Sequence, residues 1–410
     1  MDFNQKLEKY AELLLKKGVN LQEGQDLVLN ASIDAKEIVE VIVRLAYEKF
    51  NAGPVHVNWS YGNLARIKYE HASDDVLVDV PEYSLKKMEE LIERRAAMIS
   101  ISASNPDLLK GIDPSRIAMA GKASGLKMMP YRKQILNGDI RWCGAAIASE
   151  TWAKKVFPDL SSDKAVEKLW SYIFKCTRVD QEDAIKAWDI HLSNLEEKTS
   201  FLNEKKFTKL HYKSRKTDLH VDLPEGHIWI SGGDPATDGH VFIPNVPTEE
   251  IFTTNHKYGV NGTLASTMPL NLRGTLVEDF VLTFKDGKVV DFDAKVGKES
   301  LESLLDMDEG AKYLGEVALV PFNSPISNLN TIFYNTLYDE NASCHFAFGR
   351  AYASCVEGGN DMSDDDLEKA GINNSLVHTD FMVGSNELDI DGYDADGNVT
   401  PLFRKGDWAF

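Results

Sequence analysis

The strongest constraint on the fold is an alternation of short apolar runs with amphipathic segments in the first half of the chain. Residues 26–30 and 55–59 have strand composition, and residues 33–50 between them keep apolar side chains on one helical face. Parallel strands need a long crossover, usually a helix, whereas antiparallel strands need only a tight turn. This β-α-β order therefore predicts an α/β N-terminal domain with a mostly parallel sheet.

The same order recurs further along, with a helical pattern at residues 84–95 and short apolar runs at 98–102 and 142–148. The helical spacing of apolar residues also predicts an opening helix from Phe3 to Leu14. No Gly-x-Gly-x-x-Gly motif follows any of these strands. The pattern therefore does not indicate the nucleotide-binding use of a parallel sheet.

Two more helical segments follow, residues 162–174 and the strongly charged stretch 180–204. After them the spacing of apolar residues changes from helical to strand-like. Alternating strand patterns follow at residues 209–213, 218–222 and 227–231. We place the boundary near residue 190. We therefore expect an α/β domain over residues 1–190 and a mixed α+β, β-rich domain over residues 191–410.

Two turn-rich segments belong to this second half. Asp286-Gly287 separates two alternating runs and predicts a hairpin over residues 281–292. The acidic residues 389–398 have the composition of a calcium loop, but no register gives the acids, the glycine and the final glutamate that an EF-hand needs. We therefore expect a turn-rich β connection there.

Composition narrows the class of protein. The chain has 64 acidic and 45 basic residues and a net charge of −19, so we expect neither nucleic acid nor a membrane as a partner. No stretch approaches the ~18 apolar residues of a membrane-spanning helix, and the first residues lack a signal-peptide pattern. The four cysteines form no Cys-x-x-Cys pair. A cytoplasmic protein is expected, and any metal site should use oxygen and nitrogen ligands.

Several acids and histidines in the second half are candidate ligands. His378 and Asp380 alternate in a strand-like run and project from the same side, as a chelating pair or as a hydrogen-bonded pair on a sheet surface. Glu316 lies in an apolar run, and a buried carboxylate needs a cation, a hydrogen-bond network or a metal. His345 fits a ligand or a core histidine. Glu250, at a predicted turn, fits a ligand or a solvated acid.

Four segments together resemble the thermophilic metallo-aminopeptidase family. They are Pro-Thr-Glu-Glu-Ile-Phe-Thr around Glu250, Leu-Gly-Glu-Val-Ala-Leu around Glu316, the block from His345 to Tyr352, and Val-His-Thr-Asp-Phe-Met-Val-Gly around His378. The resemblance extends over nearly the whole chain. It implies a homodimer and a centre of two divalent ions (Zn²⁺, Co²⁺ or Mn²⁺) beside Tyr352, with the ligands Glu250, Glu316, His345, His378 and Asp380.

The activity implied by the resemblance is removal of the N-terminal residue from peptides. Two divalent ions can lower the pKa of a shared water from ~15.7 towards ~7. Tyr352 is then expected to donate a hydrogen bond to the oxyanion, and Glu316 or Glu249 to carry the proton to the leaving amine. Two alternatives stay open: a two-metal hydrolase of another bond, such as a phosphoester, and a metal-stabilised binding protein without catalysis.

Overall fold

The computed structural model describes residues 1–272 and 275–410, which fold into two compact units. The first unit comprises Met1–Asp189 and Gly233–Pro247, and the second comprises Ile190–Gly232 and Thr248–Phe410. The predicted domains 1–190 and 191–410 are continuous stretches, whereas the segment Gly233–Pro247 packs with the first unit. Pro244 of this segment accepts a hydrogen bond through its carbonyl from the backbone N–H of Gly144, at 2.6 Å.

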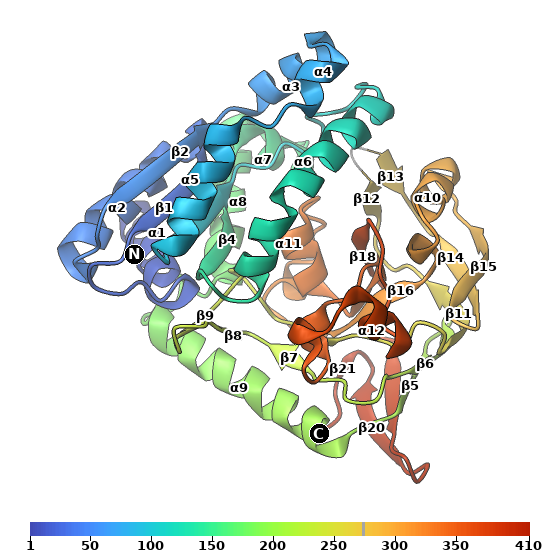
Figure 1. Cartoon of the computed structure of the whole chain (residues 1–410). Coiled ribbons are helices and arrows are strands. Elements are labelled where there is room, and N and C mark those ends of the chain that lie inside the picture. The colour runs from blue at the N-terminus through green and yellow to red at the C-terminus, as the bar shows by residue number, and fades with distance from the viewer. Residues whose placement is uncertain (273–274) are drawn as a thin grey trace. The chain divides into compact units, whose positions relative to one another are not determined.

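A four-stranded sheet of order β2-β1-β3-β4 is the centre of the first unit (Figure 1). All three pairings are parallel, so the predicted parallel α/β sheet is confirmed. The strands are β1 (Leu27–Ser32), β2 (Val55–Ser60), β3 (Ala97–Ser102) and β4 (Trp142–Ala146). Apolar side chains of β1 and β3, such as Leu27, Leu29 and Ile99, are fully buried.

Helices surround this sheet, and the start of the first helix, α1, is determined by its capping residues. Asp2 accepts a hydrogen bond from the Gln5 backbone and forms a capping box, so the first turn of α1 is satisfied. Helix α6 has no counterpart among the predicted segments. The bounds are α1 (Phe3–Leu13), α2 (Lys36–Phe50), α3 (Gly62–His71), α4 (Asp74–Val78), α5 (Glu82–Glu93), α6 (Pro114–Leu136), α7 (Glu150–Val156) and α8 (Ser162–Cys176), and α9 (Ala184–Lys205) contains the boundary between the units.

The second unit is β-rich, as predicted, and its two largest sheets are antiparallel, beside a short antiparallel pair of β12 (Leu270–Leu272) and β13 (Thr275–Val277). The larger has the order β15-β14-β11-β6-β5-β19-β20-β21 and the smaller the order β18-β17-β16-β10-β7. The larger sheet comprises β5 (Lys209–Lys213), β6 (Asp218–Asp222), β11 (Val260–Ala265), β14 (Val281–Lys285), β15 (Lys288–Asp293), β19 (Asp389–Tyr393), β20 (Val399–Arg404) and β21 (Asp407–Trp408). The smaller comprises β7 (Ile230–Ser231), β10 (Ile251–Thr253), β16 (Leu314–Leu319), β17 (His345–Gly349) and β18 (His378–Met382).

The two sheets share one hydrophobic core. Tyr212 of the larger sheet lies 5.0 Å from Phe346 of the smaller one, measured between ring centroids. Val317, Phe348 and Phe381 belong to the same buried cluster. One face of the smaller sheet is therefore mostly apolar and packs in the core, and the polar ligand side chains project from the other face.

Most of the predicted β segments are confirmed, with one difference. β14 and β15 form the hairpin around Asp286-Gly287, and β19 and β20 form another around the acidic run, where Asp394 accepts hydrogen bonds from the Asp396 and Asn398 backbones. Residues 227–231 are strand only at Ile230–Ser231, because the chain is still turning where the His227 ring bonds the Pro224 carbonyl.

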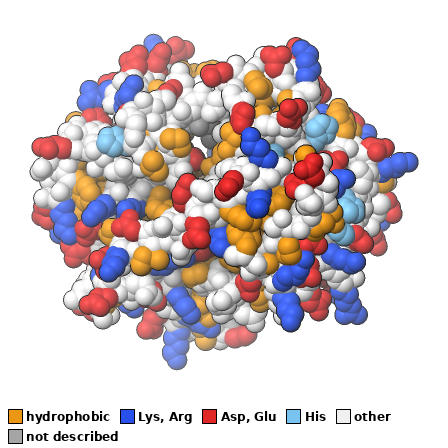
Figure 2. All heavy atoms as spheres, turned by 90° about the horizontal axis from the view of Figure 1, so that it is seen from below, with side chains coloured by type: hydrophobic (Ala, Val, Ile, Leu, Met, Phe, Trp, Pro, Cys, Tyr) orange, Lys and Arg blue, Asp and Glu red, His pale blue; other side chains and the backbone are white. Residues whose placement is uncertain are grey.

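The surface mixes charges of both signs. On the face drawn in Figure 2, acidic and basic side chains lie interspersed among hydrophobic ones. Among the helices in the described ranges, none combines the length and the apolar character needed to cross a membrane.

Candidate metal centre

The smaller sheet of the second unit brings the predicted ligands together. Glu250 immediately precedes β10, and Glu316 lies within β16. His345 begins β17, and His378 and Asp380 lie on β18. These four strands are neighbours in the sheet, although they come from distant parts of the chain. All five predicted ligand residues therefore share one region of one sheet.

Strand register explains how the side chains converge. Glu316 is paired with Ala347, and Ala347 is paired with Asp380, so the three lie in one row across the sheet and project from one face. The methyl group of Ala347 is the smallest side chain that a non-glycine residue can place between the two acids. The neighbouring Phe346 and Phe348 point to the opposite, core face, as the alternation around His345 predicted.

Glu316 lies at the middle of the cluster, between the two histidines. Its Oε1 is 3.6 Å from Nε2 of His345, and its Oε2 is 3.3 Å from Nε2 of His378. His345 Nε2 is also 3.2 Å from Glu250 Oε2, and His378 Nε2 is 3.4 Å from Asp380 Oδ1. The result is two adjoining groups of potential ligands, each with one imidazole and two carboxylates, that share Glu316.

Backbone carbonyls orient both imidazoles. Nδ1 of His345 lies 3.0 Å from the Ser343 carbonyl, and Nδ1 of His378 lies 2.7 Å from the Arg350 carbonyl. A proton on Nδ1 satisfies each carbonyl and directs Nε2 at the carboxylates. Metal-binding histidines are usually held in this way. Each Nε2 can therefore donate a second proton to the acids or present its lone pair to a cation between them.

Burial and charge make the cluster favour cations. Burial opposes ionisation of Glu316, but hydrogen bonds from His345 and His378 outweigh it and lower its pKa to about 2. Desolvation raises the pKa of Glu250. Burial disfavours protonation of both histidines, yet their hydrogen bonds to carboxylates hold each pKa well above 6.5. This environment stabilises positive charge at the point where the five side chains meet.

Tyr352 follows β17 and lies beside the cluster. Its ring is 4.8 Å from the His378 ring and 5.9 Å from the Phe252 ring, measured between centroids. The residue is 37% exposed, so it borders solvent as well as the acids. Desolvation of the hydroxyl and the negative charges of Glu316 and Asp380 raise its pKa well above 10. Tyr352 therefore stays protonated and available as a hydrogen-bond donor at neutral pH.

Two further acids lie close to these ligands. Burial, followed by the charges of Glu250 and Asp380, raises the pKa of Glu340 well above its usual value. The sequence pattern did not single out Glu340, because it precedes the His345 segment in an irregular stretch. Glu249 is buried in different surroundings, with its carboxylate 3.7 Å from His191 and its backbone N–H donating to Asn341.

The residues present fit divalent metal ions. Two imidazole nitrogens and several carboxylate oxygens are donors that Zn²⁺, Co²⁺ and Mn²⁺ accept, and no thiol is among them. Like-charged carboxylates buried this close together need a cation to be stable.

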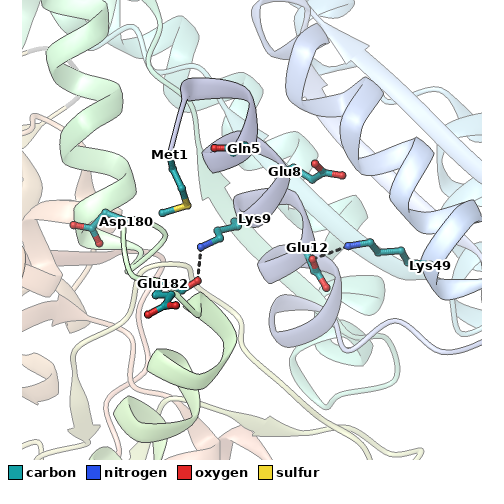
Figure 3. Close-up of a pocket in the computed structure, with 8 residues that line it drawn as sticks. All are labelled: Met1, Gln5, Glu8, Lys9, Glu12, Lys49, Asp180 and Glu182. Atoms are coloured by element: carbon teal, nitrogen blue, oxygen red, sulfur yellow. Dashed lines mark hydrogen bonds and ion pairs between the residues drawn. The ribbon is translucent and has the colours of Figure 1, made fainter.

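A pocket in the first unit has a different character. Its volume is about 680 Å³, and it is lined by Met1, Gln5, Glu8, Lys9, Glu12, Lys49, Asp180 and Glu182 (Figure 3). Lys9 points to the backbone carbonyls of Gln181 and Glu182, and Lys49 to Glu12. The lysines are therefore engaged within the wall of the pocket, and none of the predicted site residues lines it.

Comparisons with known proteins agree with this site. The sequence pattern of the family described as thermophilic metalloprotease (M29) matches residues 3–408. Aminopeptidase AmpS of Bacillus subtilis (strain 168) is 48% identical over 100% of this chain and 99% of its own. Aminopeptidase T of Thermus thermophilus is 41% identical over 99% of both chains.

A solved structure extends the similarity to three dimensions. Wild-type AmpT from Thermus thermophilus superposes with a TM-score of 0.94 at 39% sequence identity, over 100% of both chains. The resemblance inferred from four short segments thus holds along the entire length. The chain belongs to the thermophilic metalloprotease (M29) family and is a metal-dependent aminopeptidase, a hydrolase of peptides.

Proposed function

We propose that this aminopeptidase uses two divalent ions, Zn²⁺, Co²⁺ or Mn²⁺, with Glu316 shared between them. Glu250 and His345 would hold one ion, and His378 and Asp380 the other. The observation that carries the proposal is the position of Glu316, whose two oxygens each face a different histidine at 3.6 and 3.3 Å. A carboxylate so placed can serve two ions at once.

The roles of the chain's own residues follow from their surroundings. Bound divalent ions supply an acidified water and polarise a carbonyl oxygen. Tyr352, protonated at neutral pH, is placed at the edge of the cluster to donate a hydrogen bond to the oxyanion as the peptide carbonyl becomes tetrahedral. Glu340 offers a further carboxylate, either for the ions or for transferring a proton to the leaving amine.

The free α-amino group of a peptide explains a preference for chain ends, because an internal peptide bond offers no such group. Glu340, a carboxyl outside the proposed ligand set, would accept a hydrogen bond from that amino group and hold the first peptide bond beside Tyr352. The proposed substrates are therefore peptides cleaved after their first residue.

Metal removal tests the proposal. Exhaustive chelation should abolish hydrolysis of amino-acid p-nitroanilides, and Zn²⁺, Co²⁺ or Mn²⁺ should restore it as two ions per chain are bound. Metal analysis of each reconstituted sample measures that number. Activity that survives metal removal would overturn metal use, and full activity with one ion per chain would overturn the shared role of Glu316. A phosphoester substrate in the same assay serves as the control for bond class.

The proposal extends to the cellular location and the oligomeric state of the enzyme. We infer a cytoplasmic enzyme, supported by four cysteines that are all buried and include no Cys-x-x-Cys pair. We also infer a homodimer, supported by the family resemblance of the sequence.

A further inference from the structure

A second group of potential metal ligands lies in the larger sheet of the second unit, on strands that carry none of the proposed catalytic ligands. β5 and β6 pair antiparallel, with His211 directly opposite His220. Asp218 lies two residues before His220, so its side chain projects from the same face of the sheet. One ligand atom from each of the three residues lies within 4.8 Å of the others.

The alternation of β5 and β6 turns these three side chains away from the core. The residues between them, which point to the opposite face, are fully buried: Leu210, Tyr212, Leu219 and Val221. Asp218 and His220 are exposed, and the His211 side chain is 16% exposed. The hairpin thus buries one face and presents two imidazoles and a carboxylate on the other.

The contacts within the group are close. Nε2 of His211 lies 2.7 Å from Oδ1 of Asp218. The rings of His211 and His220 stack, with centroids 4.1 Å apart and planes 16° from parallel. A surface ion pair explains the contact between His211 and Asp218 but needs no second histidine. The opposed position of His220 adds the donor that a three-ligand site requires.

Two neighbouring acids have basic partners of their own. Asp391 on β19 is opposite His211 and pairs with Arg404. Lys209 pairs with Asp222 at 3.4 Å. These partners leave the carboxylate of Asp218 as the acid that faces the two histidines.

The donor types and spacings suit a first-row transition-metal ion. Such ions bind imidazole nitrogen and carboxylate oxygen at about 2.0–2.2 Å, so an N and an O ligand on one ion lie about 3 Å apart. The 2.7 Å contact is close to that separation. Because a bound ion lies in the plane of an imidazole, two stacked rings cannot both bind it. The exposed His220 ring must turn, and no core packing opposes that rotation.

We propose that His211, Asp218 and His220 form a second metal site, which binds one Zn²⁺ or Cu²⁺ ion on the outer face of the β5–β6 hairpin. The site is separate from the catalytic centre and does not depend on its mechanism. The three ligands come together only when the strands are in register. The ion therefore binds the folded chain and raises its melting temperature as the metal concentration rises.

Equilibrium dialysis of the full chain against Zn²⁺, followed by metal analysis, tests the site. His220→Asn should hold one ion fewer per chain than the unmodified protein. His71→Asn is the matched control, because His71 is an exposed histidine 3.8 Å from an acid, Glu70, and belongs to no group of three ligands in the described residues. It should bind as much Zn²⁺ as the unmodified protein.

Two more measurements keep the test decisive if one variant folds poorly. Asp218→Asn can still bond His211 but loses the negative charge, and it should weaken Zn²⁺ binding at this site at least about tenfold. The electron paramagnetic resonance spectrum of bound Cu²⁺ should show two imidazole nitrogens in the unmodified protein. Equal Zn²⁺ content in the His220→Asn variant, or an equal loss in the His71→Asn variant, would overturn the proposal.

Discussion

Glu249 and Glu250 are neighbours in the chain with opposite surroundings. The Glu250 carboxylate lies 3.2 Å from His345, in the cluster of proposed metal ligands, whereas the Glu249 carboxylate lies 3.7 Å from His191. Successive side chains in an extended segment point to opposite sides, so only one of two adjacent acids can reach the cluster. Local sequence gave no reason to choose between them, and the resemblance to the family did. The choice of Glu250 as a metal ligand stays a prediction.

Exchange of the two acids for amides separates their roles. Glu250→Gln should lower kcat/KM at least about 10²-fold and reduce metal content. Replacing a residue that only hydrogen-bonds to a metal ligand lowers activity or metal affinity about 10- to 100-fold, and replacing a proposed ligand itself should cost more. Glu249→Gln should keep its metal and change kcat/KM less than about tenfold. Metal analysis and steady-state kinetics on both variants check this. The reverse ranking would exchange the two assignments.

Tyr352 is proposed to act beside the cluster, with its ring 4.8 Å from the His378 ring between centroids. Tyr352→Phe removes the hydroxyl but keeps the ring. It should lower kcat about 10²–10³-fold, the cost of a lost oxyanion donor, with unchanged metal content. Steady-state kinetics with metal analysis measures both quantities. An unchanged kcat would leave Tyr352 as a packing residue.

At the scale of elements, the strands of the site were predictable as strands but not as partners. The alternation around His345 and between His378 and Asp380 predicted which side chains share a face, and both patterns are confirmed. The pairing of β16 with β17 and of β17 with β18 depends on contacts between remote segments. No local pattern indicates that Ala347 lies between Glu316 and Asp380.

The segment before Glu340 is held by a buried carboxylate. Asp339 accepts hydrogen bonds from the Phe333 backbone at 2.7 Å and the Asn335 backbone at 3.1 Å. Burial raises its pKa to about 7, although these backbone N–H groups oppose the rise. The folded chain therefore binds this proton more tightly than the unfolded chain does, so the proton stabilises the fold at low pH.

Folding stability should depend on this proton in a defined window. The stabilising contribution is complete below pH about 4 and is lost as the pH rises to about 7, by up to about 4 kcal/mol. Asp339→Asn carries no such proton, so its stability should fall less over that range. Urea unfolding of both proteins with chelator present, at several pH values from 4 to 8, measures the difference. Identical pH profiles would contradict the assignment to Asp339.

The whole molecule adds features that no single element carries. The first unit includes the segment Gly233–Pro247, although this segment follows the start of the second unit in the sequence. A single boundary in the sequence cannot describe a unit made of two separate segments. That unit also exposes large apolar side chains, among them Leu64 (63% exposed), Ile67 (51%) and Tyr83 (74%). Exposed apolar surface of this kind is often covered by a partner.

Sedimentation equilibrium should find a species of twice the 45.8 kDa chain mass. Because each chain carries a net charge of −19, two copies repel each other, and added salt should strengthen the association by screening that repulsion. The same measurement at low and high salt checks both expectations. A single species at the chain mass under both conditions would contradict the homodimer.

The sequence by itself determined the local structure and the chemical types at the site. The period of apolar residues predicted the parallel α/β half, the β-rich half and the faces of the ligand strands, because periodicity reflects which side of an element meets the core. Four short motifs also sufficed to identify the family.

Only the tertiary structure decided which of these residues meet. The meeting of Glu250, Glu316, His345, His378 and Asp380 depends on strand register between segments far apart in the chain. Register is set by packing of the whole core and not by neighbouring residues. A carboxylate in an apolar strand is therefore recognisable from sequence, but whether its partner is a histidine, a lysine or water is decided by the fold.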